Sequence, residues 1–423
     1  MHMSEPRATN NNRRRAVITG LGVIASNGIG KEAFWNALRE GKSGIKKITS
    51  FDASTYSTKI AGEVRNFEPT DYMSPKSARR IDRFAQFAIA AARLALEDAH
   101  LNINDNNSKK IGISIGSSLG ALPHAETQHS IFLEKGLDRT DPLLALRLYA
   151  GEASSYMSIE LGIKGPCYTF STGCVSATDA MGYALTLIRN NTVDVLITGG
   201  TEAPIAPLAF GSFCRLRAMS ERNGDPTTAC RPFDKNRDGF VMSEGSGMLV
   251  LEDLEHALKR NAHIYAELIG FGANSEAYHM TKPLETAEGT IETVLIAIQD
   301  AGIQPEEIDY INAHGTSTAL NDKTETLAYK KIFGPHAYDI PISATKSMTG
   351  HTLGSSGAVE AVATALILEH QFIHPTINYE TPDPECDLNY VPNKGIKADV
   401  RVGLSNSLGF GSRNAAIILK KYE

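Results

Sequence analysis

Cys174 stands in the segment FSTGCVSATDA (170–180), where small residues lead into a stretch with helical periodicity. Apolar residues recur there every three or four positions, which predicts a helix with one face in the core, formed by Ala177, Met181, Leu185 and Ile188. We therefore expect Cys174 at or near the helix N-terminus, where the partial positive charge favours a thiolate. A thiolate is a soft nucleophile suited to thioesters. The segment alone also fits a buried structural cysteine.

Two histidines lie in loops rich in glycine and hydroxyl residues. His314 follows a predicted strand in INAHGTST (311–318), and loops after strands are where α/β proteins place catalytic groups. His351 precedes a predicted helix in SATKSMTGHTLGSSGAVEA (343–361), and the positive helix end disfavours its imidazolium form. A neutral histidine can donate one hydrogen bond from a defined nitrogen. Lys346 lies five residues before His351 and could pair with Glu360; structural histidines and a surface lysine are the alternatives.

A glycine-rich segment near the end of the chain, SNSLGFGSRN (405–414), suits a tight turn. Backbone N–H groups in such a turn can point into a site and bind an oxyanion. An ordinary glycine-rich turn explains the segment equally well. One further motif, GLGVIA (20–25), matches the dinucleotide-binding pattern GxGxxA, but no second strand ending in an acidic residue follows it. We therefore reject a dinucleotide site.

Composition narrows the class of protein. The 423 residues carry a net charge of −6, so no basic surplus supports nucleic acid as a main partner. Five cysteines without a CxxC pair indicate neither a disulfide framework nor a zinc site, and they fit a reducing cytoplasm. The polar N-terminus lacks the apolar core of a signal peptide, and no apolar run reaches the ~20 residues of a membrane span.

Short β-rich runs alternate with amphipathic ones, which predicts an α/β fold. Strands are expected at 16–23, 111–116, 193–198, 247–251 and 265–272, and helices at 31–40, 82–99 and 252–261. The two halves are weakly similar in sequence: AVITGLGV in the first half resembles AELIGFGA in the second. We therefore expect an internal duplication around a shared core. We predict halves at 15–262 and 263–423, a cap or interface insertion at about 120–165, and a disordered tail at 1–14, whose Met1-His2-Met3 resembles a cloning scar.

Taken together, these segments resemble the β-ketoacyl-[acyl-carrier-protein] synthases, most closely the type II synthase of bacterial fatty acid synthesis. The resemblance runs from about residue 15 to residue 422 and includes RPFDKNRDGFVMSEGSGMLVLE (231–252), AYHMT (277–281), TKSMTGH, CDLNYVP (386–392) and SNSLGFG. The set of Cys174, His314 and His351 matches the family's Cys-His-His triad. The resemblance implies a thiolase-like fold of two pseudo-equivalent halves with mixed sheets in five αβαβα layers. It also implies a dimer.

The resemblance further implies roles for single residues. Cys174 would take an acyl group from the phosphopantetheine of an acyl carrier protein, with no other bound cofactor and no metal. His314 and His351 would promote decarboxylation of a malonyl-carrier, and the carbanion would attack the acyl-Cys174 thioester. The backbone N–H groups of Cys174 and Phe410 would form an oxyanion hole, and Phe410 would also be a gate over the acyl pocket. Lys346 and Glu360 would support the catalytic network. The implied phosphopantetheine or substrate contacts are Thr316, Thr318, Gly409 and Leu119, of which Leu119 would also bound the acyl tunnel.

Three departures from the family pattern surround the expected pocket. Gly173 stands where alanine is usual, Ser412-Arg413 interrupts the usual GFGG run, and 143–156 is unusually charged. They leave open a ketosynthase of a polyketide or other specialised pathway, acting with a chain-length-factor partner. A non-catalytic partner subunit would have no use for Cys174. A thiolase would need a second active-site cysteine, and Cys386 lies outside a glycine-rich loop.

Overall fold

A computed structural model describes residues 13–423, so most of the predicted tail, including Met1-His2-Met3, lies outside the described residues. Arg14, at the end of that tail, forms ion pairs of 2.9 Å with both Asp194 and Asp253. Within residues 13–423, no helix combines the length and the apolarity needed to cross a membrane.

The first half of the chain forms a five-stranded mixed sheet. Its strands lie in the order β6-β5-β7-β8-β1, where β5 is parallel to β6 and β7, and β8 is antiparallel to β7 and β1. The bounds are Ala16–Ala25 (β1), Ile111–Gly116 (β5), Cys167–Phe170 (β6), Val195–Glu202 (β7) and Gly245–Asp253 (β8). The expected strand at 111–116 agrees with β5 in both bounds, whereas β7 continues four residues past the expected end, because its residues stay buried and paired with β8.

The second half repeats this arrangement. Its strands lie in the order β11-β10-β14-β15-β9. β10 is parallel to β11 and β14, and β15 is antiparallel to β14 and β9. The bounds are Ala266–Ser275 (β9), Tyr310–Asn312 (β10), Ile342–Ser343 (β11), Val402–Gly409 (β14) and Arg413–Lys420 (β15). β1 and β9 pair antiparallel and, with β2 (Gly28–Ile29), join both halves into one 11-stranded sheet. The predicted fold of two pseudo-equivalent halves is confirmed.

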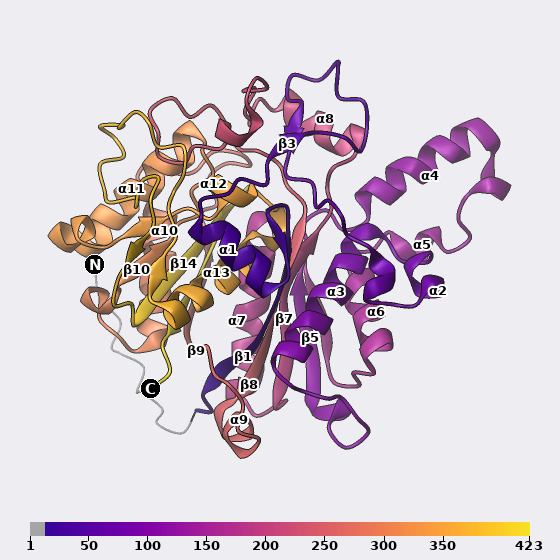
Figure 1. The fold of residues 1–423 in the computed structure, drawn as a ribbon, viewed down its shortest axis with the longest axis horizontal. Coiled ribbons are helices and arrows are strands. Elements are labelled where there is room, and N and C mark those ends of the chain that lie inside the picture. The colour runs from indigo at the N-terminus through magenta and orange to yellow at the C-terminus, as the bar shows by residue number, and fades with distance from the viewer. Residues whose placement is uncertain (1–12) are drawn as a thin grey trace.

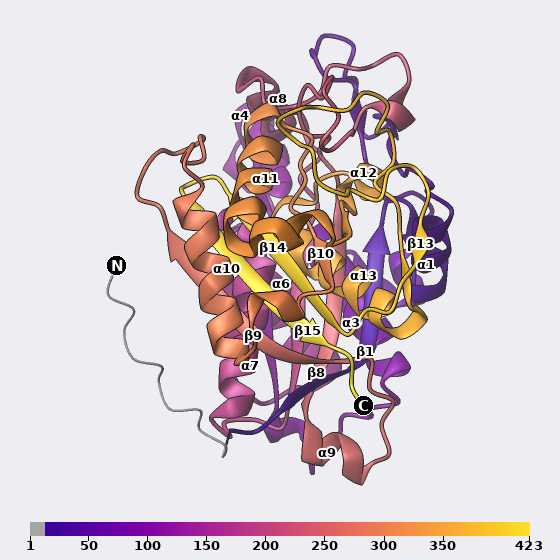
Figure 2. The same cartoon turned by 90° about the vertical axis from the view of Figure 1, so that its left-hand side faces the viewer.

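Helices complete five layers (Figures 1 and 2). α7 and α13 lie between the two parts of the sheet and contact strands of both halves, whereas α3 and α6 cover the first half and α10 and α11 the second. Their bounds are Arg83–Asp98 (α3), Glu152–Leu161 (α6), Ser176–Arg189 (α7), Glu288–Ala301 (α10), Ala319–Phe333 (α11) and Ser356–His370 (α13). All residues of α13 from Ser356 to Leu368 are buried, as a central layer requires.

The contact of α3 with β1 shows how the layers approach so closely. The Asp82 side chain caps α3 by accepting from the Phe84 N–H, and the alanine-rich helix buries ten residues. Gly22 of β1 faces this helix, and a Cβ there would lie 1.9 Å from the Ala91 carbonyl oxygen. Small residues on both elements therefore set the distance between the helix and the sheet.

An arm formed by α4 (Leu122–Lys135) and the segment through α5 (Leu144–Arg147) extends from the first half, and the chain returns from it to α6 (Figure 1). Its side chains include Leu133 and Leu137, which are 69% and 72% exposed. The remaining short elements are α1 (Lys31–Arg39), α2 (Pro75–Ala78), α8 (Pro207–Arg215), α9 (Leu254–Lys259), α12 (Lys346–Thr349), β3 (Lys46–Lys47), β4 (Ile60–Ala61), β12 (Phe372–Ile373) and β13 (Ile396–Lys397).

Candidate active site

One cavity of about 370 Å³ brings together Cys174, His314 and His351. Cys174 lies in the short helix η4 (Gly173–Val175), directly before α7. His314 follows β10, and His351 lies between α12 and the helix η8 (Leu353–Ser355) that leads into α13. Each residue therefore stands where a strand or a central helix ends, and the two central helices bring both halves of the chain to one site.

Cys174 is 9% exposed and lines the cavity. Burial raises the pKa of the Cys174 thiol to about 11, and the backbone N–H groups of Phe410 and of Cys174 itself act in the opposite direction. The charge of Lys346 also opposes burial and is the smaller influence. Burial therefore opposes the thiolate that the helix end was predicted to favour, and Cys174 lies at that helix end as expected.

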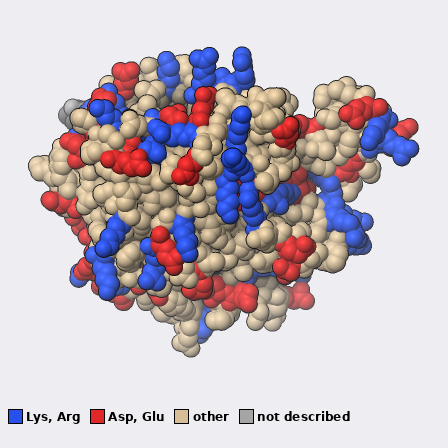
Figure 3. All heavy atoms as spheres, turned by 45° about the horizontal axis from the view of Figure 1, so that its top comes forward, with Lys and Arg blue, Asp and Glu red and all other residues tan. Residues whose placement is uncertain are grey.

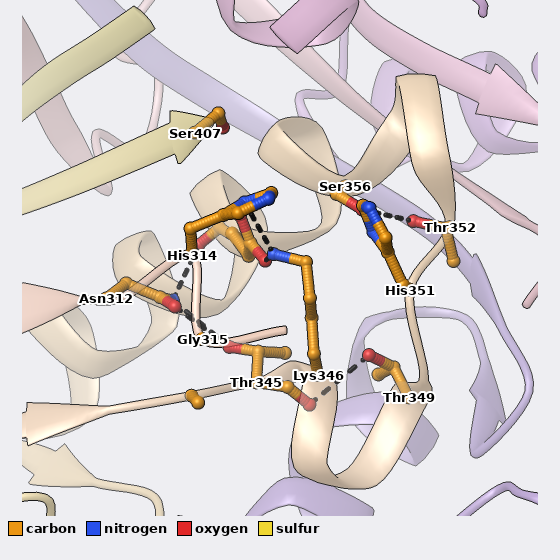
Figure 4. A network of polar contacts seen from close by, with 12 residues as sticks. Asn312, His314, Gly315, Thr345, Lys346, Thr349, His351, Thr352, Ser356 and Ser407 are labelled. Carbon is orange, nitrogen blue, oxygen red and sulfur yellow. Dashed lines mark hydrogen bonds and ion pairs between the residues drawn. The ribbon is translucent and has the colours of Figure 1, made fainter. Parts of the chain in front are cut away.

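His314 is held in one tautomer by a buried ammonium group. The Lys346 Nζ lies 3.1 Å from the His314 Nδ1, and an ammonium can only donate, so Nδ1 accepts and Nε2 carries the proton (Figure 4). Burial, with the charge of Lys346, holds the pKa of His314 well below its usual range. The backbone is fixed by Glu325, whose carboxylate accepts from the N–H groups of His314 (2.6 Å) and Gly315 (2.8 Å).

His351 stands perpendicular to His314, with ring centroids 5.4 Å apart. Its Nδ1 lies 2.9 Å from the Ser356 hydroxyl, as Figure 4 shows. Its backbone N–H donates to the Val241 carbonyl (2.7 Å), which ties the loop to the segment 240–243. Burial and the charge of Lys346 hold the pKa of His351 well below its usual range. The histidine is neutral as predicted, but because of burial rather than the helix end.

Lys346 and Glu360 form the predicted pair, and both side chains are 1% exposed. They lie behind His314 and do not line the cavity. Burial raises the pKa of Glu360 to about 7 against the lowering influence of Lys346. The second oxygen of Glu360, Oε2, has no hydrogen-bond partner within residues 13–423.

The other predicted residues fall into two groups. Thr316, Thr318, Gly409 and Phe410 line the cavity, and the hydroxyl oxygens of the two threonines lie 2.9 Å apart. Leu119 does not line it, but packs against the apolar cluster that contains Cys174.

Sequence reasoning missed two buried glutamates that position the site. Glu202, at the end of β7, accepts from the N–H groups of Ser118 (2.7 Å), Leu119 (3.1 Å) and Gly354 (3.1 Å), and so joins loops of the two halves. Burial raises its pKa to about 7. Glu325 similarly holds the loop of His314. An acidic residue at the end of a buried strand was the one available signal for Glu202.

Sequence reasoning also missed two walls of the cavity. They come from α8 and the residues after it, and from the segment 276–283 that follows β9. The second wall contains AYHMT, which belonged to the resemblance but had no assigned position. Arg217, Lys282 and Arg413 line the cavity and are exposed, and the acidic residues Asp238 and Glu276 line it as well.

Solved structures with the same fold define the class of protein as ketosynthases. A structure named the ishigamide ketosynthase/chain length factor is 39% identical with a TM-score of 0.91, over 97% of this chain and 100% of that chain. A structure of a type II PKS acyl-carrier protein in complex with its ketosynthase is 37% identical in sequence with a TM-score of 0.90, again over 97% of this chain and 100% of that chain.

Sequence comparisons agree. The model of the β-ketoacyl synthase N-terminal domain matches residues 13–257, and that of the C-terminal domain matches 265–380. Relatives called 3-oxoacyl-[acyl-carrier-protein] synthase 2 are 47% identical in Synechocystis sp. and 46% in Coxiella burnetii, each over 97% of this chain and 99% of theirs. The chain belongs to the β-ketoacyl synthase family of condensing enzymes, which are acyltransferases.

Proposed function

We propose that Cys174 carries the growing acyl chain and that His314 and His351 activate a malonyl group held on a carrier protein. The observation that carries this proposal is that one cavity contains a thiol and two imidazole rings, whose centroids are 5.4 Å apart and whose pKa values burial holds well below the usual range.

The first half-reaction transfers an acyl group to the enzyme. The Cys174 sulfur loses its proton and attacks the acyl thioester of the carrier, and the departing pantetheine thiolate takes up a proton. Burial makes that deprotonation unfavourable, whereas the charge of Lys346 and the N–H groups of Phe410 and Cys174 oppose this effect. Those two N–H groups also suit the oxyanion of the tetrahedral intermediate.

The second half-reaction forms the carbon–carbon bond. His314 Nε2–H, and the corresponding N–H of His351, would donate to the thioester carbonyl of the malonyl group. Loss of CO2 then leaves an enolate, whose carbon attacks the acyl-Cys174 thioester, and the sulfur departs as thiolate. Neutral imidazoles with lowered pKa values suit this task, because each must supply a hydrogen bond without an added proton. The reaction needs no further bound cofactor.

Substrates would arrive on phosphopantetheine. Thr316 and Thr318 lie in the cavity wall, where their hydroxyls could bind the amide groups of this arm. Arg217, Lys282 and Arg413 also line the cavity and could attract its phosphate. Figure 3 shows groups of Lys and Arg among acidic side chains on the face that carries the top of Figure 1.

The acyl substrate is proposed to be a fatty acyl chain, because relatives called 3-oxoacyl-[acyl-carrier-protein] synthase 2 are more similar in sequence than the polyketide ketosynthases. Elongation of a polyketide chain is the alternative, supported by the altered turn at Ser412-Arg413 and by the polyketide enzymes among the similar structures. Intact-mass measurement after incubation with acyl-carriers of several lengths, fatty and polyketide, separates the two.

We further propose a dimer and a cytoplasmic location. Within residues 13–423, β6 pairs with β5 on one side only. The adjoining arm and α6 expose large apolar side chains that a second subunit would cover: Phe132, Leu133, Leu137, Leu146 and Ile159. The partner would be a second copy or a homologous chain-length-factor subunit. Sedimentation of the purified chain tests this, and a monomer at micromolar concentration would exclude the homodimer. The free cysteines suit a reducing compartment.

Three substitutions test the roles in catalysis. Cys174→Ala should abolish covalent acylation, and an acylated mutant seen by intact mass would refute the nucleophile. His314→Ala and His351→Ala should still become acylated but fail to condense. Full condensation by both variants would remove the role proposed for the histidines.

A further inference from the structure

Ser412 lies in the turn between β14 and β15, two residues after Phe410. It stands where the family pattern has glycine, and it adopts a φ of +61°, which is uncommon for any residue with a side chain. Glycine would reach this conformation without strain, so the turn by itself gives no reason for a serine. The reason must lie in what the hydroxyl contacts.

The Ser412 hydroxyl binds the segment 276–281, which follows β9 and forms one wall of the cavity. It donates to the His279 carbonyl (2.9 Å) and accepts from the N–H groups of His279 (3.0 Å) and Tyr278 (3.2 Å). A hydroxyl has one donor and two acceptor positions, so all of its hydrogen-bonding capacity is used here.

Two backbone hydrogen bonds join the same segments. The Glu276 N–H donates to the Ser412 carbonyl (2.8 Å), and the Gly411 N–H donates to the Met280 carbonyl (2.7 Å). These two do not depend on the side chain at 412. The hydroxyl therefore adds three hydrogen bonds to a junction that a glycine would hold with two.

This junction lies close to the nucleophile. A Cβ on Gly409 would lie 3.4 Å from the Cys174 backbone nitrogen, and a Cβ on Gly173 would lie 3.4 Å from the Phe410 carbonyl oxygen. The Phe410 side chain, 37% exposed, lines the same cavity as His279 and Met280. A displacement of the turn would therefore move both the side chain over the cavity and a proposed oxyanion donor.

We propose that Ser412 is a positioning residue whose hydroxyl latches the Phe410 turn to the 276–281 wall, and so limits how often the cavity opens to Cys174. This inference rests on the proposed function of Phe410 as the gate over the acyl-carrying cysteine. The latch favours the closed arrangement, in which the Phe410 turn lies against the backbone of Gly173 and Cys174. Release of the latch would make Cys174 more accessible.

The test is the rate at which iodoacetamide alkylates Cys174 in the full-length protein, followed by peptide mass spectrometry. Free glutathione in the same sample serves as the internal reference. Ser412→Ala removes the hydroxyl and keeps the Cβ, whereas Ser412→Gly also relieves the backbone strain. Asn261→Gly is the matched control, because Asn261 is exposed and also has a positive φ, of +54°. It follows α9, which lies far from α12, the helix that carries Lys346 beside the active site (Figure 1).

Both Ser412 variants should be alkylated roughly fivefold faster than the parent, which corresponds to the loss of a net hydrogen bond, and Asn261→Gly should be unchanged. The increase should appear in the limiting rate of the pH profile at high pH, which reports access. An unchanged limiting rate in both variants, or a change only in the apparent pKa of Cys174, would overturn the latch. Alkylation needs no acyl transfer, so this result is independent of whether Cys174 proves to carry the substrate.

Discussion

Replacement of Glu325 by alanine tests whether one buried carboxylate holds the loop of His314. Its Oε1 accepts from the His314 N–H (2.6 Å) and the Tyr329 hydroxyl (2.7 Å), and its Oε2 accepts from the Gly315 N–H (2.8 Å). Alanine would leave the His314 and Gly315 N–H groups buried without this acceptor, whereas the Tyr329 hydroxyl keeps the Asn406 Oδ1 (2.6 Å). An unsatisfied buried donor costs about 1–3 kcal/mol. Burial raises the pKa of Glu325, so removal of the carboxylate returns part of its desolvation. We expect a net loss of roughly 3 kcal/mol.

Glutamine in the same place should cost less. Its single carbonyl oxygen can keep the hydrogen bonds from His314 and Tyr329, but its amide then faces the Gly315 N–H. One lost hydrogen bond to a charged acceptor corresponds to about 2 kcal/mol. Condensation should fall in both variants, because His314 loses its fixed position, whereas acylation of Cys174 should continue.

The assay is urea denaturation of the dimer or monomer as purified, with Glu306→Ala as an exposed control. An unchanged m-value would show that the difference arises in stability rather than in the denatured state. If Glu325→Ala lies within about 0.5 kcal/mol of the control, the carboxylate does not hold this loop and the reasoning fails.

Three further predictions follow from the buried charges. Lys346→Met should lower the free energy of unfolding by about 3 kcal/mol, because it leaves Glu360 buried without its partner. The double variant with Glu360→Gln should recover this stability but not condensation activity. Equal stability of the single and double variants would contradict the prediction. Burial raises the pKa of Glu152 to about 8, so between about pH 4.3 and 8 the native protein binds a proton that the unfolded chain does not. The native protein therefore loses stability as the pH rises through that window. Thermal melting should show Glu152→Gln to be more stable than the parent at about pH 8, by about 2 kcal/mol, with no difference near pH 4. The acid limb of condensation should lie below the usual histidine pKa of about 6.5, because His314 and His351 both have lowered values, and a limb at or above it in the rate profile would refute their neutral state.

Local sequence patterns were sufficient for the elements and for the identity of the reactive residues. The strand at 111–116 and the helix at 31–40 follow from period and composition, which act through neighbouring residues only. The position of Cys174 at the start of a helix was predicted in the same way, because small residues precede a segment with an apolar helical face. Several motifs in one order were enough to indicate the family.

The tertiary structure decided the properties that depend on distant neighbours. The pKa of Cys174 is raised by burial against the charge of Lys346, and neither influence can be read from the local sequence. The tautomer of His314 depends on Lys346, 32 residues away, and its backbone on Glu325. The role of Ser412 became visible only against the segment 276–281, more than a hundred residues earlier. Desolvation and hydrogen bonding act through space, so sequence proximity could not predict them.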